Sequence, residues 1–246
     1  MSAEAVVAGQ DGAQLSAERL NTYYGQSHIL RNVSFRVMPG ETVSLLGRNG
    51  MGKTTLLRSL MGLVRPRTGR IYLHGRDFTG ARPHVVARAG LAFVPEDRGI
   101  FPNLTVEENL TFAARPGRGA RDKWTLARIY TLFPRLAERR LHWGNQLSGG
   151  EQKMLSIGRA LMTNPDIMLL DEATEGLAPK VRDEIWETLR HIAASGIAAV
   201  VVDKNLDDLI ALAGRHVIMA KGEVVFDGAT DALRADDTLI HRHLGV

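Results

Sequence analysis

The chain has 246 residues, of which 44% are hydrophobic and 24% are charged, which is enough apolar material for one large domain or two lobes. It contains no cysteine, so disulfides and thiolate metal sites are excluded and a reducing compartment fits. The net charge of +4 suits a phosphate ligand, nucleic acid or an anionic membrane surface, but a charge this small is first of all compatible with plain solubility.

Residues 1–14 are predicted to be a flexible lead-in, because they have neither the basic region nor the apolar run of a signal peptide. After them, short apolar segments predict strands, and leucine or amphipathic spacing predicts helices. The predicted strands are residues 41–47, 70–75, 90–97, 166–172 and 197–203, the helices are 53–63 and 179–195, and a hairpin is 215–228, with Lys221 and Gly222 at its turn. No apolar run approaches the roughly 18 residues of a membrane span, so the chain is expected to be soluble by itself.

The segment from Thr105 to about Thr163 is mostly helical in pattern, and a polar insertion at residues 115–123 predicts an exposed loop. We expect this segment to form a second, smaller lobe at about residues 100–163. The strands and helices that alternate around it predict an α/β fold, with a mainly parallel sheet covered on both faces.

Residues 47–54, GRNGMGKT, match the pattern G-x-x-x-x-G-K-[ST] between a predicted strand and a predicted helix. The glycines Gly47, Gly50 and Gly52 allow the backbone to curl around an anion, and amides at a helix N-terminus favour phosphate. Lys53 is predicted to reach the outer phosphates, and the Thr54 hydroxyl to ligate magnesium. A glycine-rich turn before a helix is the alternative, but the flanking strand and helix favour the phosphate site.

Two carboxylates, Asp171 and Glu172, close the apolar strand IMLLD. An acid at a strand end beside a phosphate loop can hold magnesium directly or through water. The next acid points differently, because side chains alternate along a strand, and it can polarise an attacking water. An acidic helix cap is the alternative.

A second glycine motif, LSGGEQ at residues 147–152, opens the helical segment QKMLSIGRALMTNP. Ser148 is a good helix cap, and the two glycines after it leave several backbone amides exposed at the positive end of the helix. The motif therefore predicts a second phosphate-binding surface, although S-G-G before a helix is by itself more often only a cap.

Together and in this order, the motifs resemble those of the ATP-binding cassette family. GRNGMGKT resembles its phosphate loop, LSGGEQ its signature, and IMLLDE its magnesium strand with the catalytic glutamate, over about residues 15–245. The resemblance implies a P-loop NTPase whose nucleotide-binding domain is residues 15–246, with an antiparallel β subdomain and a helical subdomain that bears the signature. It also implies ATP and Mg²⁺ as cofactors, and a head-to-tail pair in which the signature of one cassette caps the nucleotide of the other.

The resemblance also assigns the site residues. ATP is expected at Tyr24, Gly47, Arg48, Asn49, Gly50, Met51, Gly52, Lys53, Thr54 and Thr55, and the partner's ATP at Ser148, Gly149, Gly150 and Glu151. Tyr24 stands where the family places an aromatic that stacks on adenine, and a half-buried strand tyrosine is the alternative.

Within the family, VPEDRGIFPNLTVEENL, DEATEGLAP and the ending HRHLGV resemble the shorter ATPase of Liv-type branched-chain amino acid importers. That ATPase commonly has VPEGR where other cassettes have a glutamine, and Glu96 stands in the place of the glutamine here. In the family this loop contacts magnesium and relays to the membrane subunit. Glu96 is therefore expected to ligate Mg²⁺ with Thr54 and Asp171, and a surface acid in a loop is the alternative.

Most members of the family have a histidine after the strand VVVD, where this sequence has Lys204. A lysine is a point cation without an acceptor atom, so it can bind a terminal phosphate but cannot accept a hydrogen bond from water while it is charged. The hypothesis is that Glu172 and Lys204 are the catalytic residues and that hydrolysis is slower than at a histidine-bearing site. A solvent-exposed lysine is the alternative.

The resemblance thus predicts the ATP-hydrolysing subunit of an importer for branched-chain amino acids or related small polar solutes, at the cytoplasmic face of the inner membrane. Its expected partners are a paralogous ATPase or a second copy, two membrane permeases and, indirectly, a periplasmic substrate-binding protein, without nucleic acid. A soluble cassette ATPase acting on DNA or ribosomes usually carries two cassettes or large insertions, and a small-molecule phosphoryl transferase needs no signature. These two classes are the alternatives, and fold alone never fixes the substrate.

Overall fold

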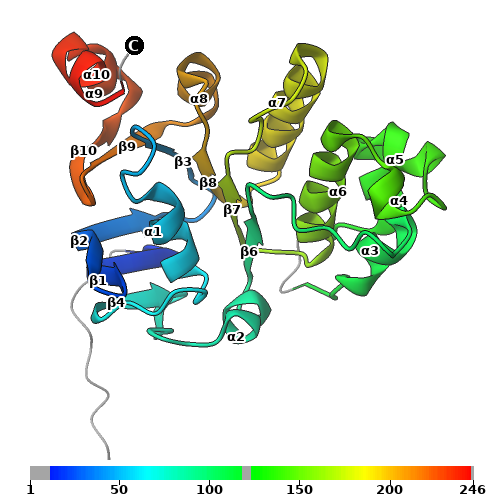
Figure 1. The fold of residues 1–246 in the computed structure, drawn as a ribbon, viewed down its shortest axis with the longest axis horizontal. Helices are drawn as coiled ribbons and strands as arrows, with labels where there is room; N and C mark the ends of the chain where they lie inside the picture. Colours follow the sequence, from blue (N-terminus) through cyan, green and yellow to red (C-terminus); the bar gives the residue numbers. More distant parts are fainter. Residues whose placement is uncertain (1–11, 118–122, 245–246) are drawn as a thin grey trace, which may run out of the picture.

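The computed structural model describes residues 12–117 and 123–244, so the expectations for residues 1–11 and for the middle of the loop at 115–123 lie outside the described part. The larger of two sheets contains β3 (Thr42–Leu46), β6 (Leu91–Val94), β7 (Ile167–Asp171), β8 (Ala198–Val202), β9 (Arg215–Ala220) and β10 (Glu223–Ala229). Its order is β10-β9-β3-β8-β7-β6, and it is parallel except at β10, which pairs antiparallel with β9 (Figure 1). Each of these strands lies within a segment that the sequence predicted as a strand or as the hairpin, give or take one residue.

The smaller sheet is antiparallel. It contains β1 (Leu15–Tyr24), β2 (Ser27–Val37), β4 (Thr68–Leu73) and β5 (Arg76–Asp77), in the order β2-β1-β4-β5. The predicted antiparallel β subdomain is therefore confirmed.

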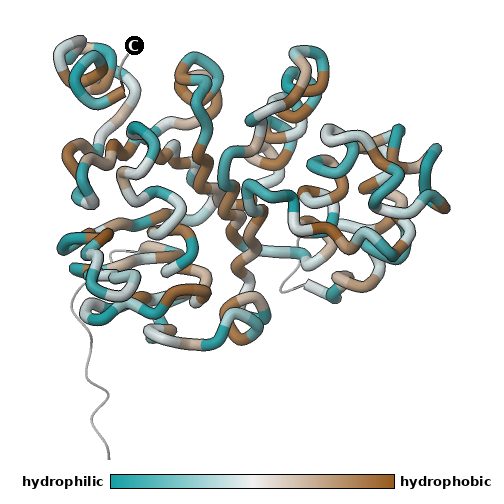
Figure 2. Tube along the Cα trace, viewed as in Figure 1, coloured by the Kyte–Doolittle hydropathy of each residue, from teal (hydrophilic) through white to brown (hydrophobic). Residues whose placement is uncertain are grey.

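The central strands β3, β8 and β7 are mostly apolar and buried along their whole length, so both faces of the larger sheet are covered there (Figure 2). Successive side chains of a strand point to opposite faces, and Val200 and Val201 of β8 accordingly belong to two different buried clusters. The Val200 cluster includes α1 (Lys53–Leu60) and the smaller sheet. The Val201 cluster includes α7 (Pro179–Ala194), α8 (Leu206–Leu212) and the helical lobe.

The helical lobe lies beyond β6 in Figure 1. It contains α3 (Val106–Phe112), α4 (Leu126–Leu132), α5 (Pro134–Glu138), a 3-10 turn (Gly144–Gln146) and α6 (Gly149–Met162). Thr105 and Ser148 open α3 and α6 with reciprocal capping boxes, which satisfy the first amides of each helix. The lobe shares its apolar core with the larger sheet, so it is an extension of one domain.

Three short helices complete the described chain: α2 (Pro83–Arg88), α9 (Thr230–Arg234) and α10 (Asp237–Leu244). Among the described residues, every helix is too short or too polar to cross a bilayer.

The topology gathers three predicted segments at one edge of the larger sheet. Register pairs Ser44 with Val201 and Asp171 with Val202, so the carboxyl ends of β3, β8 and β7 lie side by side. The glycine loop follows β3, Glu172 follows β7 and Lys204 follows β8 closely. Ligands of open α/β sheets bind at such an edge.

Candidate functional site

The loop between β3 and α1 follows a left-handed backbone path that requires glycine at two close approaches. Gly47 has a φ of 133°, and a Cβ there would lie 2.3 Å from the carbonyl oxygen of Met219 in β9. Gly52 has a φ of 103°, and a Cβ would lie 3.0 Å from Leu30 Cδ2. A Cβ on Gly50 would meet nothing within 4 Å, so this glycine faces open space.

The turn between β9 and β10 supports the same loop. The amide of Gly222 donates to the carbonyl of Met51 at 3.2 Å, and the amide of Lys221 lies 3.1 Å from Met51 Sδ. The Met51 side chain therefore faces the hairpin, and Met51 is not among the residues that line the cavity over the loop.

Lys53 is buried at the start of α1, and its ammonium lies across the loop. Nζ donates to the carbonyl of Gly47 at 2.6 Å and to that of Arg48 at 3.0 Å. Burial lowers the pKa of Lys53, and the carboxylate of Asp171 counteracts this effect. A cation held in this way is available to phosphate oxygens above the loop.

The hydroxyl of Thr54 donates to Oδ1 of Asp171 at 3.1 Å, which joins the phosphate loop to the end of β7. Asp171 is 1% exposed, and burial raises the pKa of its carboxyl, while the Thr54 hydrogen bond lowers it. A hydroxyl and a carboxylate in contact beside a phosphate loop are the groups that hold Mg²⁺ in P-loop NTPases.

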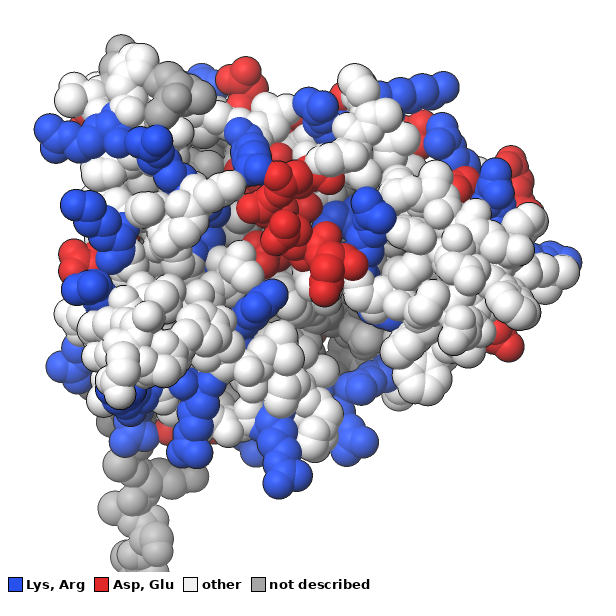
Figure 3. Space-filling model, in the orientation of Figure 1, with Lys and Arg blue, Asp and Glu red and all other residues white. Residues whose placement is uncertain are grey.

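A cavity of about 420 Å³ opens over the loop. It is lined by Ile29, Asn49, Gly50, Gly52, Lys53, Thr54, Thr55, Glu96, Glu172 and Glu175. Carboxylate oxygens of the three glutamates lie within 4.8 Å of one another, and Figure 3 shows acidic side chains gathered near the middle of this face. Hard divalent cations prefer such oxygen ligands, so the donor set fits Mg²⁺.

Glu172 combines burial with backbone strain. Its φ is 47°, a left-handed value that costs a non-glycine residue about 1–3 kcal/mol. The side chain is 13% exposed, and Oε2 is buried without a hydrogen-bond partner among the described residues. An unsatisfied carboxylate oxygen at the edge of the phosphate cavity is suited to polarise a water molecule.

Lys204 lies beside the phosphate loop, since it lines one cavity together with residues 47–49 and Lys53 of that loop. The side chain is 53% exposed, forms an ion pair with Glu175, and places Nζ 3.9 Å from Oε2 of Glu172. It lines a second cavity of about 350 Å³, which also includes Lys53, Glu172 and, from α10, Leu244. The structure thus brings the lysine to the same edge of the sheet as the phosphate loop, with a carboxylate partner.

Tyr24 ends β1 and is 45% exposed. It does not line either cavity beside the loop, whereas Ile29, across the β1–β2 turn, lines the first. An exposed tyrosine ring is available for stacking, so the adenine assignment stays a prediction.

The signature residues form a separate surface. The Ser148 hydroxyl accepts from the amide of Glu151 at 3.3 Å, and the Glu151 carboxylate accepts from the amide of Ser148 at 2.8 Å. Gly149 lies against the guanidinium of Arg98, since a Cβ would be 2.9 Å from its Nη2, and a Cβ on Gly150 would be 2.5 Å from Val181 Cγ1. Neither cavity beside the phosphate loop is lined by a signature residue.

Sequence reasoning missed Glu175, which lines the phosphate cavity and pairs with Lys204. The available signal was its place three residues after Glu172, in a loop that leaves the sheet at the catalytic edge.

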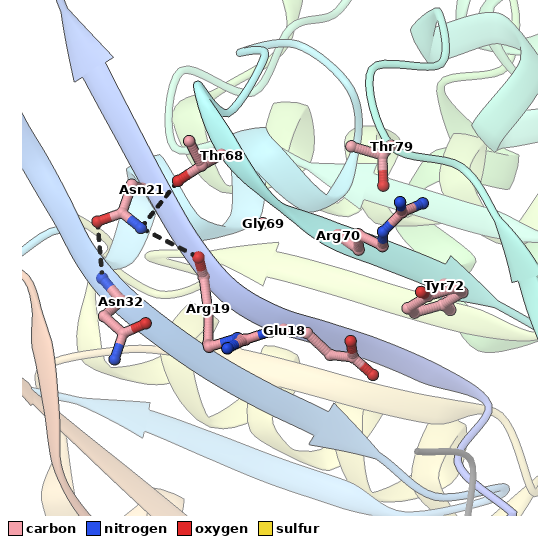
Figure 4. A pocket seen from close by; sticks show the side chains of 9 residues that line it. All are labelled: Glu18, Arg19, Asn21, Asn32, Thr68, Gly69, Arg70, Tyr72 and Thr79. Atoms are coloured by element: carbon pink, nitrogen blue, oxygen red, sulfur yellow. Dashed lines mark hydrogen bonds between the residues drawn. The ribbon is translucent and has the colours of Figure 1, made fainter. Parts of the chain in front are cut away.

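A third cavity, of about 710 Å³, is a shallow polar hollow on the smaller sheet (Figure 4). Within it the Asn21 amide donates to the carbonyl of Arg19 and to the Thr68 hydroxyl, and accepts from the amide of Asn32. These bonds stabilise a bulge in β1, where Arg19 has a φ of 48°. The Asn21 side chain is satisfied by the fold, and we assign no ligand to this hollow.

Comparison with known proteins identifies the family. The model of the ABC transporter family matches residues 30–175. The high-affinity branched-chain amino acid transport ATP-binding protein BraG of Pseudomonas aeruginosa is 37% identical over 231 residues, which cover 94% of this chain and 99% of that protein. The lipopolysaccharide export system ATP-binding protein LptB of Acidithiobacillus ferridurans is 33% identical, with 94% of this chain and 96% of that protein covered.

Among solved structures, the dimeric post-hydrolysis state of an ATP-binding cassette bound to ADP and Pi superposes with a TM-score of 0.73. It is 27% identical, and the match covers 88% of this chain and 98% of that chain. The predicted fold and the predicted family are both confirmed. The chain belongs to the ABC transporter family, as an ATP-binding subunit and ATP hydrolase.

Proposed function

We propose that this chain is the ATPase subunit of an importer for branched-chain amino acids or related small polar solutes, and that it couples ATP hydrolysis to transport. The similarity to BraG, whose name gives that cargo, supports the proposal. The similarity to LptB, whose name gives lipopolysaccharide export, makes export the competing assignment. The ATPase does not touch the cargo in either case, so the membrane subunits decide between them.

One observation carries the catalytic assignment: the phosphate loop and Glu172 line one cavity, Asp171 accepts a hydrogen bond from Thr54 of that loop, and no signature residue lines the cavity. The loop residues 47–55 bind the phosphates of ATP, and Tyr24 stacks on adenine. Thr54, Asp171 and Glu96 would hold Mg²⁺, which neutralises phosphate charge when bound. Glu172 polarises the attacking water, and Lys204 contacts the terminal phosphate.

The same separation supports a head-to-tail pair of cassettes. Ser148, Gly149, Gly150 and Glu151 lie at a capped helix N-terminus, which favours an anion. They do not line the cavities of their own phosphate loop, so they are free to cap the nucleotide of a partner cassette. The partner is a paralogous ATPase or a second copy of the chain.

An exposed apolar patch beside the loop of Glu96 supports docking to membrane permeases. It contains Phe101 and Phe112, and we assign to it Leu141 and Trp143, which are exposed in the same helical lobe. Phe101 and Phe112 meet edge to face at 5.5 Å, and the buried Asn109 amide holds the backbone of Phe101 from both sides. Exposed apolar patches mark interaction sites. Docked there, the chain would sit at the cytoplasmic face of the inner membrane, and the permeases would receive solute from a periplasmic binding protein.

The testing experiment is ATP hydrolysis by the purified chain, alone and assembled with its candidate paralogue and permeases, for wild type and Glu172→Gln. Activity that appears on assembly and disappears in Glu172→Gln supports the proposed site. Activity that survives Glu172→Gln assigns hydrolysis to the partner's site. A soluble cassette ATPase acting on nucleic acid or ribosomes would instead be stimulated by those ligands and not by permeases.

The docking patch has its own test. Phe112→Ser and Trp143→Ser should abolish co-sedimentation with membranes that contain the permeases, while basal nucleotide binding stays unchanged. The exposed Val85→Ser, in α2, is the matched control, because it removes a similar apolar side chain outside the patch.

A further inference from the structure

A lysine in the signature helix is almost completely buried beneath the Glu96 loop. Lys153 of α6 is 2% exposed. Its Nζ donates to the carbonyl of Pro95 at 3.0 Å and lies 3.5 Å from the carbonyl of Glu96. A buried ammonium is costly unless it is bonded, so this position is held by a specific interaction and not by general helix packing.

The charges around Lys153 come from several elements. Burial lowers the pKa of Lys153 to about 8, Asp171 counteracts this effect, and Arg98 adds to it. Asp203 and Glu96 also raise the pKa. The side chain is therefore still mainly an ammonium at neutral pH, surrounded by the carboxylates of the catalytic edge.

Two further side chains attach the same loop to α6. Arg98 Nη1 donates to the side-chain oxygen of Gln152 at 2.9 Å, and Arg159 Nη2 donates to the carbonyl of Gly99 at 2.6 Å. Together with the bonds of Lys153, these bonds attach both ends of the loop at residues 95–99 to helix α6. That helix begins at the signature, whereas the Glu96 carboxylate lines the cavity over the phosphate loop.

We propose that Lys153 is a positioning residue that makes the Glu96 loop move with the signature helix. A nucleotide held against the signature by the partner cassette then adjusts the carboxylate edge of this chain's own site. Lys153 suits this role because its ammonium contacts the carbonyls of two successive residues, Pro95 and Glu96. Arg159 instead donates to the carbonyl of Gly99, at the far end of the loop. The inference rests on the proposed head-to-tail function.

The first test follows the loop itself. Glu172→Gln chains are paired with the candidate partner cassette in ATP, and hydrogen–deuterium exchange of residues 95–99 is compared with that of the unpaired chain. We expect pairing to slow exchange in this loop, and Lys153→Met to remove that response. Arg159→Gln is the matched control, because it also removes an α6 cation bonded to this loop, and it should keep the response.

The second test is a double-mutant cycle on the ATPase of the assembled complex. Lys153→Met should lower kcat by about tenfold, with the affinity of the isolated chain for ATP within about twofold of wild type. In a Glu96→Ala background, Lys153→Met should lower kcat by less than about twofold, because the effect of Lys153 passes through Glu96. Lys153→Arg, which keeps the charge and the donors, should recover part of the loss.

A slowing of exchange on pairing that is as large in Lys153→Met as in the chain with Lys153, or equal losses of kcat in the two backgrounds, would overturn the proposal. If Lys153→Met does not fold, Lys153→Gln keeps a donor without the charge and takes its place. Failure of the wild-type chain to pair in ATP would refute the head-to-tail function, and the inference would fall with it. Normal pairing with an unresponsive loop refutes the inference alone.

Discussion

Lys204, just past the end of β8, forms an ion pair with Glu175, in the loop that follows β7. The pair joins the segments after two neighbouring strands of the larger sheet. Glu175 also brings a third carboxylate to the cavity, so the cation and the acid partly neutralise each other at the catalytic edge. The lysine is thereby held near Glu172 without depending on a nucleotide.

Substitution of Lys204 by histidine should raise the turnover of the assembled transporter. A neutral imidazole can accept a hydrogen bond from water, which a charged lysine cannot do. It also does not form the ion pair that Lys204 forms with Glu175. We expect kcat for ATP to rise by about threefold or more. Lys180→His, at an exposed position in α7, is the control. Unchanged or reduced turnover in Lys204→His would count against a role of Lys204 in limiting hydrolysis.

Glu172→Gln should not destabilise the nucleotide-free chain, although it removes the proposed catalytic carboxylate. Oε2 of Glu172 is buried without a hydrogen-bond partner among the described residues, and Lys204 lies 3.9 Å away, so the charge carries a desolvation cost in the resting fold. We expect the free energy of unfolding, measured in urea, to stay equal or to rise by up to about 1 kcal/mol. A clear loss of stability would mean that the carboxylate has a structural role.

Gly150 and Gly149 should respond differently to alanine. A Cβ on Gly150 would lie 2.5 Å from Val181, a branched side chain packed in α7, so Gly150→Ala should cost about 1–3 kcal/mol of stability. A Cβ on Gly149 meets only the end of the Arg98 side chain, which can move, so we expect a change below about 0.5 kcal/mol. Urea midpoints of both variants check this.

The cause assigned to Gly150 can be checked by removing the clashing methyl groups. Val181→Ala in the same chain should recover most of the stability lost in Gly150→Ala, because the two substitutions share one contact. Losses that simply add would show that the clash with Val181 is not the reason.

The burial of His216 predicts that the free energy of unfolding falls at acidic pH. It is fully buried in β9, with Nδ1 2.6 Å from the Ser44 hydroxyl and Nε2 2.8 Å from the Thr230 hydroxyl. Burial, and then Arg234, lower the pKa of His216 below its ordinary value of 6.5. The unfolded chain therefore takes up the proton more readily, so the contribution of His216 is complete above about pH 6.5 and is lost as the pH falls through the lower folded value.

Urea unfolding between pH 7.5 and pH 5 measures this contribution. Stability should fall on acidification in wild type and fall less in His216→Gln, which cannot be protonated. At pH 7.5 the variant should be less stable by about 1–3 kcal/mol, because it disturbs two buried hydrogen bonds. His84→Gln, exposed in α2, should keep the wild-type slope. Parallel slopes in all three chains would exclude His216 as the cause.

The sequence predicted the parts of the fold that have a local pattern. β3, β6, β7 and β8 are short, mostly buried apolar segments, so their bounds follow from local sequence alone. β1 and β2 were not predicted, apart from the strand tyrosine Tyr24. The bulge at Arg19 interrupts the alternation of buried and exposed residues in β1, and this interruption hides the strand.

The site was predictable where a motif fixes the backbone and not where tertiary packing brings residues together. Gly47 and Lys53 belong to one loop, and Asp171 follows from its strand. Lys153 belongs to an amphipathic helix, in which a lysine is ordinarily exposed, and only the packing of α6 against the loop at 95–99 buries it. The ion pair of Lys204 depends likewise on the spatial order of β7 and β8.

The support of the phosphate loop by the β9–β10 hairpin also orders events during synthesis. The GRNGMGKT motif leaves the ribosome before the β9–β10 hairpin, whose Met219 carbonyl and Gly222 amide pack against Gly47 and Met51. A nascent chain that stops before β9 carries the whole motif without these contacts. We therefore expect such a chain to capture ATP poorly, so that each new molecule acquires its nucleotide only after the β9–β10 hairpin has been translated.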